Sequence, residues 1–154
     1  MPDRSVKSWT IEVEAPPAVA FHYLSDVGRH AEWSPKPYRV DPVPDPPLQQ
    51  GTVYQSYGAI PGDKQHANDV EVTLVDAPRR LVLTSTDKGE RYVHQFDVEA
   101  SGRGSRITRT VEAPQPRGFV RLFFPLIFAI FINPEVSKGM SMLKANLANA
   151  VKLS

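Results

Sequence analysis

Residues 115–154 read QPRGFVRLFFPLIFAIFINPEVSKGMSMLKANLANAVKLS, and the arrangement of the whole chain follows from this stretch. Its first half, Leu122 to Ile132, is almost wholly apolar. Its second half is amphipathic, because apolar residues recur at the spacing of one helix face. These residues are Val136, Met140, Leu143, Leu147, Ala150 and Val151. We therefore predict a long C-terminal helix that follows a pause at Asn133-Pro134 and packs one face against the rest of the chain.

The chain before this stretch alternates apolar with polar residues, the pattern of strands that bury one face. A first strand over Val6–Glu14 is followed by a helix that begins near Pro17 and by a helical turn over Arg29–Ser34. Six further strands are predicted over Tyr38–Val43, Thr52–Ile60, Asn68–Val75, Arg80–Thr86, Arg91–Glu99 and Ser105–Val111. Short turns separate the last five, so neighbouring strands should pair as an antiparallel meander. The prolines around Tyr38–Val43 restrict that strand to an edge of the sheet or to extended coil.

Together these elements predict an α+β fold in a single domain, residues 1–154. A length of 154 residues suits one domain, and 41% hydrophobic with 23% charged residues is an ordinary globular balance. The element order is one strand, two helices, six strands and the long helix. We expect a curved antiparallel sheet of about seven strands that wraps round the C-terminal helix and leaves a pocket between them.

Composition excludes several classes of function and location. The formal net charge of +1 provides no overall attraction for nucleic acid, so no nucleic-acid partner is expected. The chain has no cysteine, which removes disulfides, thiolate catalysis and Cys-ligated zinc and fits a reducing cytoplasm. Residues 1–5 are not followed by the apolar core of a signal peptide. The apolar run of residues 122–132 falls short of the roughly 20 residues that a spanning helix needs.

Neither a metal nor a cofactor is expected from the motifs. The histidines at positions 22, 30, 66 and 94 lack the spacing of metal ligands, and a catalytic metal site needs three convergent ligands. No Gly-rich phosphate-binding loop is present, because Gly102-Arg103-Gly104 is a hairpin turn without a following helix.

Three segments of the chain carry a family resemblance. They are the opening strand with its Pro-initiated helix (residues 11–21, IEVEAPPAVAF), the turn that follows (residues 27–35, VGRHAEWSP), and Gly51-Thr52-Val53 at the start of the third strand. On these segments the chain resembles the START-like, birch-pollen-allergen-like superfamily, also called the SRPBCC or polyketide cyclase/dehydrase group. The resemblance extends over nearly the whole chain, and its motifs are signatures of fold rather than of catalysis.

The resemblance implies a helix-grip fold, in which a curved antiparallel sheet grips a long C-terminal helix with a hydrophobic cavity between them. Members of the group bind sterols, lipids, polyketides or plant hormones, and a few catalyse cyclisation or dehydration. No catalytic set runs through the group, so the resemblance assigns no catalytic residue here. The chain departs from the family pattern at Phe119–Pro134, where a proline-broken apolar segment replaces an uninterrupted helix start.

Two polar residues share the apolar faces of predicted strands. His94 lies between Tyr92 and Phe96, where it is either a ligand-binding group or general base, or a core histidine with a backbone or tyrosine partner. Arg109 is in phase with Ile107 and Val111. It either binds a carboxylate or an enolate in the cavity, or lies near the sheet edge and reaches water.

The residues predicted to line the ligand cavity come from the strands and from the C-terminal stretch. They are Tyr54, Tyr92, His94, Phe96, Arg109, Phe124, Phe128 and Met140.

The apolar segment Phe119–Ile132 has more large side chains than one core-facing stripe requires. Two hypotheses follow. It is a mobile lid over the cavity mouth that contacts a membrane or a second subunit, with Pro125 and Pro134 as breakpoints. Alternatively, it is a kinked core helix packed on both sides.

Three functions remain open from the sequence. The first is binding, with possible transport, of a hydrophobic small molecule such as a lipid, sterol or polyketide. The second is a polyketide cyclase/dehydrase-type enzyme that acts in the same cavity, with His94, Arg109 or a tyrosine moving protons. The third is a protein-protein module that uses Phe119–Ile132 as a homodimer face. We favour the first, because the fold implies a cavity whereas no proton-transfer pair is visible.

Overall fold

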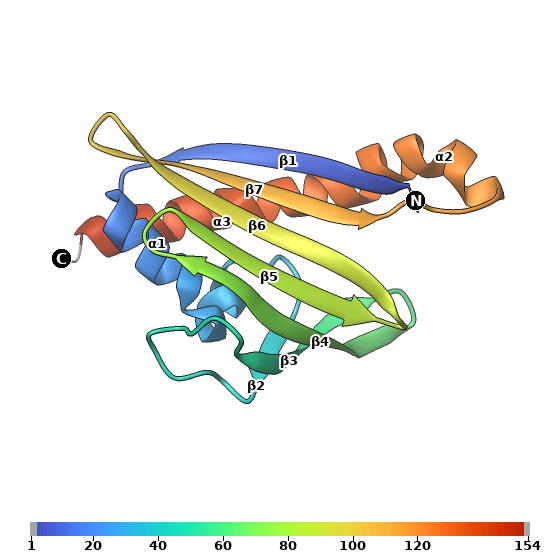
Figure 1. Ribbon diagram of the computed structural model, residues 1–154. Helices are drawn as coiled ribbons and strands as arrows, with labels where there is room; N and C mark the ends of the chain where they lie inside the picture. Colours follow the sequence, from blue (N-terminus) through green and yellow to red (C-terminus); the bar gives the residue numbers. More distant parts are fainter. Residues whose placement is uncertain (1–2, 153–154) are drawn as a thin grey trace.

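The computed structural model describes residues 3–152 and has a seven-stranded antiparallel sheet as its framework (Figure 1). Along the sheet the strand order is β1-β7-β6-β5-β4-β3-β2. The strands are β1 (Arg4–Val13), β2 (Tyr38–Asp41), β3 (Val53–Ile60), β4 (Asp63–Asp76), β5 (Arg80–Asp87), β6 (Glu90–Ser101) and β7 (Gly104–Pro114). The predicted α+β helix-grip fold and the edge position of the strand at Tyr38 are confirmed.

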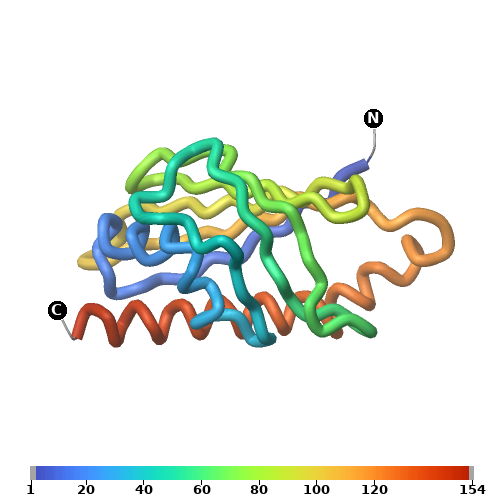
Figure 2. The backbone as a smooth tube through the Cα atoms, turned by 90° about the horizontal axis from the view of Figure 1, so that it is seen from below, coloured from blue at the N-terminus to red at the C-terminus, as the bar shows by residue number. Residues whose placement is uncertain are grey.

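Helices α1 (Pro17–Ser25) and η1 (Val27–Trp33) connect the two edge strands β1 and β2. The helical C-terminal part consists of α2 (Phe119–Ile127), η2 (Phe128–Ile132) and α3 (Asn133–Lys152). Figure 2 shows α3 running along the concave side of the sheet, while α2 projects beyond the end of it. The sheet and α3 are therefore two layers with η1 between them at one side.

The core lies between the inner face of the sheet and α3. Helix α3 buries Met140, Leu143 and Leu147 at the spacing of one helix face. The strands bury every second residue, as Phe96 and Val98 do on β6. The predicted amphipathic face of the terminal helix is thus the face that packs on the sheet.

The junction between η2 and α3 corrects one expectation. The helical chain does not pause at Asn133-Pro134 but continues through it, with a π-helical turn immediately before. Proline lacks a backbone N–H and crowds the carbonyl four residues earlier, and the wider π turn relieves that crowding. The Trp9 indole N–H donates a hydrogen bond of 2.8 Å to the Asn133 side-chain oxygen, which ties this junction to edge strand β1.

Helix α2 and turn η2 have no buried residue. Their exposed large apolar side chains are Phe119, Val120, Leu122, Phe123, Leu126, Ile130 and Phe131. The hypothesis of a core helix packed on both sides is therefore wrong. By length and composition the helical stretch Phe119–Lys152 would suffice to cross a membrane, but its second part, α3, is a core helix.

Candidate ligand-binding cavity

A cavity of about 280 Å³ lies between the inner face of the sheet, η1 and the first turns of α3. Six neighbouring strands, β2 to β7, contribute side chains to it, so the cavity floor is one continuous face of the sheet. The lining residues are His30, Trp33, Ser34, Pro35, Tyr38, Tyr54, Ser56, Asn68, Val70, Leu83, Ser85, His94, Phe96, Arg109, Glu135, Val136 and Gly139.

Gly139 allows helix α3 to approach η1 closely at the side of the cavity. A Cβ atom at this position would lie 3.2 Å from the Trp33 carbonyl oxygen. The close approach brings Trp33 against the sheet, where its ring meets the Phe96 ring edge-on at 6.0 Å between centroids. Helix packing therefore shapes one wall of the cavity.

Two histidines face the cavity from different elements. The His94 ring on β6 lies with its Nε2 atom 3.3 Å from the Ser85 hydroxyl on β5. The His30 ring on η1 places its Nε2 atom 2.7 Å from the Leu24 carbonyl oxygen, and this bond requires a proton on Nε2. His30 also stacks against Trp33, with 4.8 Å between ring centroids. A backbone carbonyl and a hydroxyl thus orient the two imidazoles.

Burial keeps both imidazoles neutral. Burial, with a smaller contribution from the positive charge of Arg109, lowers the pKa of His94 to about 3. Burial likewise lowers the pKa of His30 to about 4, against a smaller opposite effect of the Leu24 carbonyl. At neutral pH each ring therefore has one N–H and one weakly basic nitrogen, and the N–H of His30 is already used by the Leu24 carbonyl oxygen.

Arg109 is the cation of this cavity. It extends inward from β7, opposite Phe96 on β6, and burial lowers its pKa to about 10. Its guanidinium carbon lies 5.7 Å from the centre of the Phe96 ring and 5.8 Å from that of Trp33. It forms no side-chain hydrogen bond or ion pair with any residue in the described range 3–152, and its Nε atom is buried without a partner. Of the two positions predicted for Arg109, the structure shows the inward one.

Other polar atoms around the cavity are also unsatisfied. Within residues 3–152, the Tyr54 hydroxyl, the Trp33 indole N–H and the Asn68 side-chain oxygen are buried without a partner. Burial raises the pKa of Tyr54 and of Tyr38, so both phenols stay protonated. Polar groups that converge on an apolar cavity without partners are typical of a ligand site.

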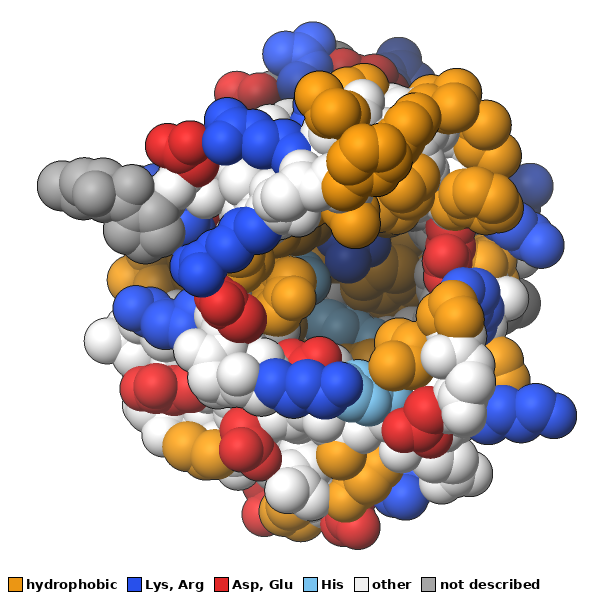
Figure 3. Space-filling model, turned by 90° about the vertical axis from the view of Figure 1, so that its right-hand side faces the viewer, with side chains coloured by type: hydrophobic (Ala, Val, Ile, Leu, Met, Phe, Trp, Pro, Cys, Tyr) orange, Lys and Arg blue, Asp and Glu red, His pale blue; other side chains and the backbone are white. Residues whose placement is uncertain are grey.

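The cavity opens at the end of the molecule where α2 projects. Figure 3 views this end and shows a hollow with histidine surface inside it and hydrophobic side chains gathered above its rim. On the cavity wall, Glu135 of α3 forms an ion pair with Lys36 at 3.2 Å, which links the helix to the chain that follows η1. No group of three or more His, Cys, Asp or Glu that could hold a metal occurs in the described part of the chain.

Four of the eight predicted cavity residues line it: Tyr54, His94, Phe96 and Arg109. The other four lie elsewhere. Tyr92 shares the inner face of β6 with His94, but it lies two residues nearer the β5–β6 hairpin and does not line the cavity. Phe124 and Phe128 pack outside the cavity, with 6.3 Å between their ring centroids. The Phe128 ring centroid lies 6.0 Å from that of Trp9. Met140 is 1% exposed within the core. These four would contact only a ligand that extends beyond the cavity.

The sequence-based prediction did not assign a role to His30, which is 7% exposed. A signal for it exists, because Val27, His30 and Trp33 recur every three residues and are the buried residues of a 3₁₀-helix. An α-helical period does not bring these three together. Ser85 and Asn68 also lacked a signal, since each is a polar residue in an otherwise ordinary strand.

Comparison with known proteins agrees with this architecture. The family described as "Polyketide cyclase / dehydrase and lipid transport" matches residues 8–148. No protein among curated sequences matches significantly.

Solved structures share the fold at low sequence identity. A Chromobacterium violaceum protein is 15% identical, with a TM-score of 0.70 over 94% of this chain and 98% of that one. A norcoclaurine synthase point mutant from Thalictrum, in complex with a transition-state analogue, is 17% identical, with a TM-score of 0.67 over 97% of this chain and 98% of that one. Ara h 8.0201 is 14% identical, with a TM-score of 0.66 over 96% and 99%. With a matching family that covers all but the ends of the chain, this protein belongs to the polyketide cyclase/dehydrase and lipid transport family of the START-like (SRPBCC) superfamily.

Proposed function

We propose that this protein binds a hydrophobic small molecule, of the lipid, sterol or polyketide class, in the cavity between the sheet and α3. The observation that carries the proposal is the cavity itself, where aromatic walls surround several polar groups without partners. Its volume of about 280 Å³ is close to the lower limit for small-molecule sites, so it favours a compact ring system. A longer molecule would extend through the mouth.

The test is to fill the cavity. Val136 lines it from α3, and Val136→Trp would place an indole where the ligand ring is expected. We expect the variant to lose binding of N-phenyl-1-naphthylamine, a neutral fluorescent probe, by at least about 10-fold. Val53→Trp is the matched control, because Val53 is 64% exposed on β3. Equal affinity in wild type and Val136→Trp would overturn the proposal, as would the absence of any binding in wild type.

A cyclase/dehydrase-type reaction in the same cavity is the alternative. The convergence of the His94 imidazole and the Arg109 guanidinium favours it, since such groups can donate to a developing oxyanion. The low pKa of about 3 for His94 makes that ring a weak base at neutral pH, so proton abstraction by it is disfavoured. Native mass spectrometry would identify the molecule that co-purifies. Its conversion by wild type but not by His94→Gln, with affinity retained, would establish the enzyme.

The exposed apolar surface of α2 and η2 is proposed to contact a membrane. Phe119, Leu122, Phe123 and Leu126 recur at i, i+3, i+4 and i+7, so they make one continuous stripe, and this stripe faces solvent instead of the core. We call these four residues, with Ile130 and Phe131, the apolar ridge.

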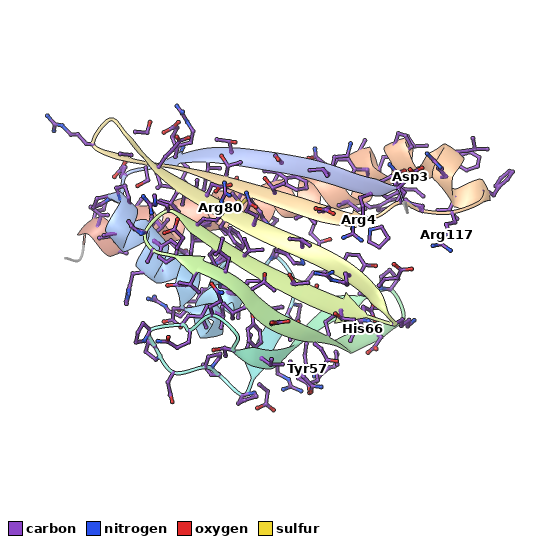
Figure 4. The ribbon with its side chains drawn as sticks, viewed as in Figure 1. Asp3, Arg4, Tyr57, His66, Arg80 and Arg117 are labelled. Carbon is purple, nitrogen blue, oxygen red and sulfur yellow. The ribbon has the colours of Figure 1, made fainter. Side chains whose placement is uncertain are left out.

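The charges beside the apolar ridge favour an anionic lipid surface over a second copy of the chain. Residues 115–134 contain Arg117 and Arg121 and no acidic residue, and Arg121 pairs with Asp3 at 3.3 Å. A symmetric dimer through residues 115–134 would bring no acidic residue of this segment to Arg117, whereas anionic headgroups would neutralise it. Figure 4 places Arg4 and Arg117 at the same end of the molecule. We therefore propose a cytoplasmic protein that contacts the membrane peripherally, with its cavity mouth near the apolar ridge.

A further inference from the structure

Arg109 carries a positive charge that no described residue neutralises through an ion pair. A guanidinium that loses its water is strongly destabilised unless an anion or several acceptors replace that water. Among the described residues the lining contains one carboxylate, that of Glu135, which is paired with Lys36 at 3.2 Å. No ion pair or side-chain hydrogen bond joins Arg109 to any of residues 3–152.

The neighbours of Arg109 offer it only weak compensation. The ring faces of Trp33 and Phe96, both within 6 Å of the guanidinium carbon, provide cation–π contacts. The one ionisable group whose charge acts in favour of the Arg109 cation is the Tyr38 phenol, and burial raises the pKa of Tyr38 so that it stays neutral at ordinary pH. His30 and His94 are neutral as well, and the charge of Arg109 contributes to lowering the pKa of each. Among the described lining residues, Arg109 is therefore a cation without an ion-pair partner, and the one carboxylate, that of Glu135, is paired with Lys36.

We infer that the ligand is an organic anion: an apolar ring system that carries a carboxylate or another oxyanion, which the Arg109 guanidinium binds. This inference rests on the proposed function and narrows it to one ligand class. A guanidinium binds an oxyanion with two parallel N–H donors, and the bond is strengthened where water is excluded. The aromatic rings on either side match the apolar body of such a ligand.

Two probes with one scaffold test the inference. N-phenyl-1-naphthylamine is neutral, and 8-anilinonaphthalene-1-sulfonate is the same amine with an anionic sulfonate. For each probe, only the part of the wild-type affinity that Val136→Trp removes is assigned to the cavity. Binding on the apolar ridge, which this substitution leaves unchanged, is thereby excluded. We expect wild type to prefer the sulfonate by about 10-fold or more. Arg109→Met should abolish this preference and keep the affinity for the neutral probe, while Arg109→Lys should retain part of it.

The outcomes separate the inference from the proposed function. Binding of the neutral probe without a preference for the sulfonate, or a preference that survives in Arg109→Met, would overturn the anionic ligand and leave the hydrophobic cavity standing. If Val136→Trp removes no affinity for either probe, the proposed function fails and the inference fails with it.

Stability gives a second readout that a structural role for Arg109 would not give. Since the Arg109 cation is partly buried and has no partner among the described residues, Arg109→Met should raise the midpoint of thermal unfolding of the ligand-free protein. A buried arginine that held the fold together would lower that midpoint on replacement. Loss of the sulfonate preference combined with a higher midpoint is the result that the inference requires.

Discussion

At the scale of the residue, the cavity contains imidazoles that burial keeps neutral and a guanidinium that is charged but has no ion-pair partner among the described residues. His94 and His30 are neutral because burial opposes their protonation, and Arg109 stays charged without a counter-ion. A side chain that serves only stability is normally satisfied within the protein. Arg109 lacks such a partner among the described residues, and the proposed ligand would supply one.

The two histidines predict an acid sensitivity of known sign. The pKa values of His94 and His30, about 3 and about 4, lie below the ordinary value of 6.5. Between pH 6.5 and these values the unfolded chain therefore binds more protons than the folded chain. The free energy of unfolding should therefore be fully retained above pH 6.5 and fall as the pH falls towards 3. The other ionisable groups of the lining are Arg109, Tyr38, Tyr54 and Glu135.

A single substitution tests this sign. His94→Gln should remove on the order of 3 kcal/mol of the decrease in unfolding free energy between pH 7 and pH 4. Urea denaturation at a series of pH values measures it, with His22→Gln, at an exposed position, as the control. A pH dependence identical in wild type and His94→Gln would show that His94 takes up its proton in the folded state.

At the scale of the element, the C-terminal helical stretch has two parts that differ in burial. Helix α3 packs on the sheet through Met140, Leu143 and Leu147, whereas α2 and η2 turn their large apolar side chains to solvent. The π-helical turn η2 and the Trp9–Asn133 hydrogen bond lie at the boundary between the exposed apolar part and the core helix α3. The edge strand β1 thereby holds the apolar ridge in a set position beyond the sheet.

The apolar ridge predicts binding to anionic vesicles. The protein should co-sediment with phosphatidylcholine vesicles that contain about one-third phosphatidylglycerol, and binding should weaken with salt. Leu122→Ser with Leu126→Ser should reduce it by about 10-fold or more, because both side chains are exposed and their loss leaves the core intact. Val53→Ser is the control, since Val53 is equally exposed on β3.

Two results would contradict membrane contact. One is vesicle binding that is unchanged in the double variant. The other is a doubled mass in light scattering that the double variant abolishes, in the absence of vesicle binding. The second result would identify the apolar ridge as a face between two copies of the chain.

At the scale of the whole molecule, one sheet serves as core and as cavity wall. Towards the C-terminal end of α3 the inner face is filled by side chains from helix and strands, and near the start of α3 the same face is left open. A ligand bound there would contact the sheet, η1 and α3 together. Its binding should consequently stabilise the fold as a unit.

Thermal unfolding tests this link. We expect a single cooperative transition, as for one domain, and an increase of roughly 5–10 °C in its midpoint at a probe concentration about 100 times the Kd. Val136→Trp should show the transition without the increase. Two separate transitions, or an increase that is equal in both proteins, would contradict a single domain with its ligand in the cavity.

The sequence by itself determined the order of strands and helices, the inner face of each strand and the amphipathic face of α3. These properties are periodic and local, since the alternation in β6 or the helical spacing from Met140 to Leu147 is legible without any distant contact. The inward direction of His94 followed from the same alternation, because it shares a face with Phe96.

Only the tertiary structure decided which inward residues meet an open space. Gly139 permits α3 to approach η1, His30 arrives from a 3₁₀ turn, and Arg109 forms no ion pair with any described residue. None of these facts is local in the sequence. Phe124 and Phe128 were predicted to line the cavity, yet α2 extends past the end of the sheet, so they pack against Trp9 and each other. Periodicity states which way a side chain points. What it meets depends on how distant elements pack around it, and among the described residues that packing leaves Arg109 without an ion-pair partner.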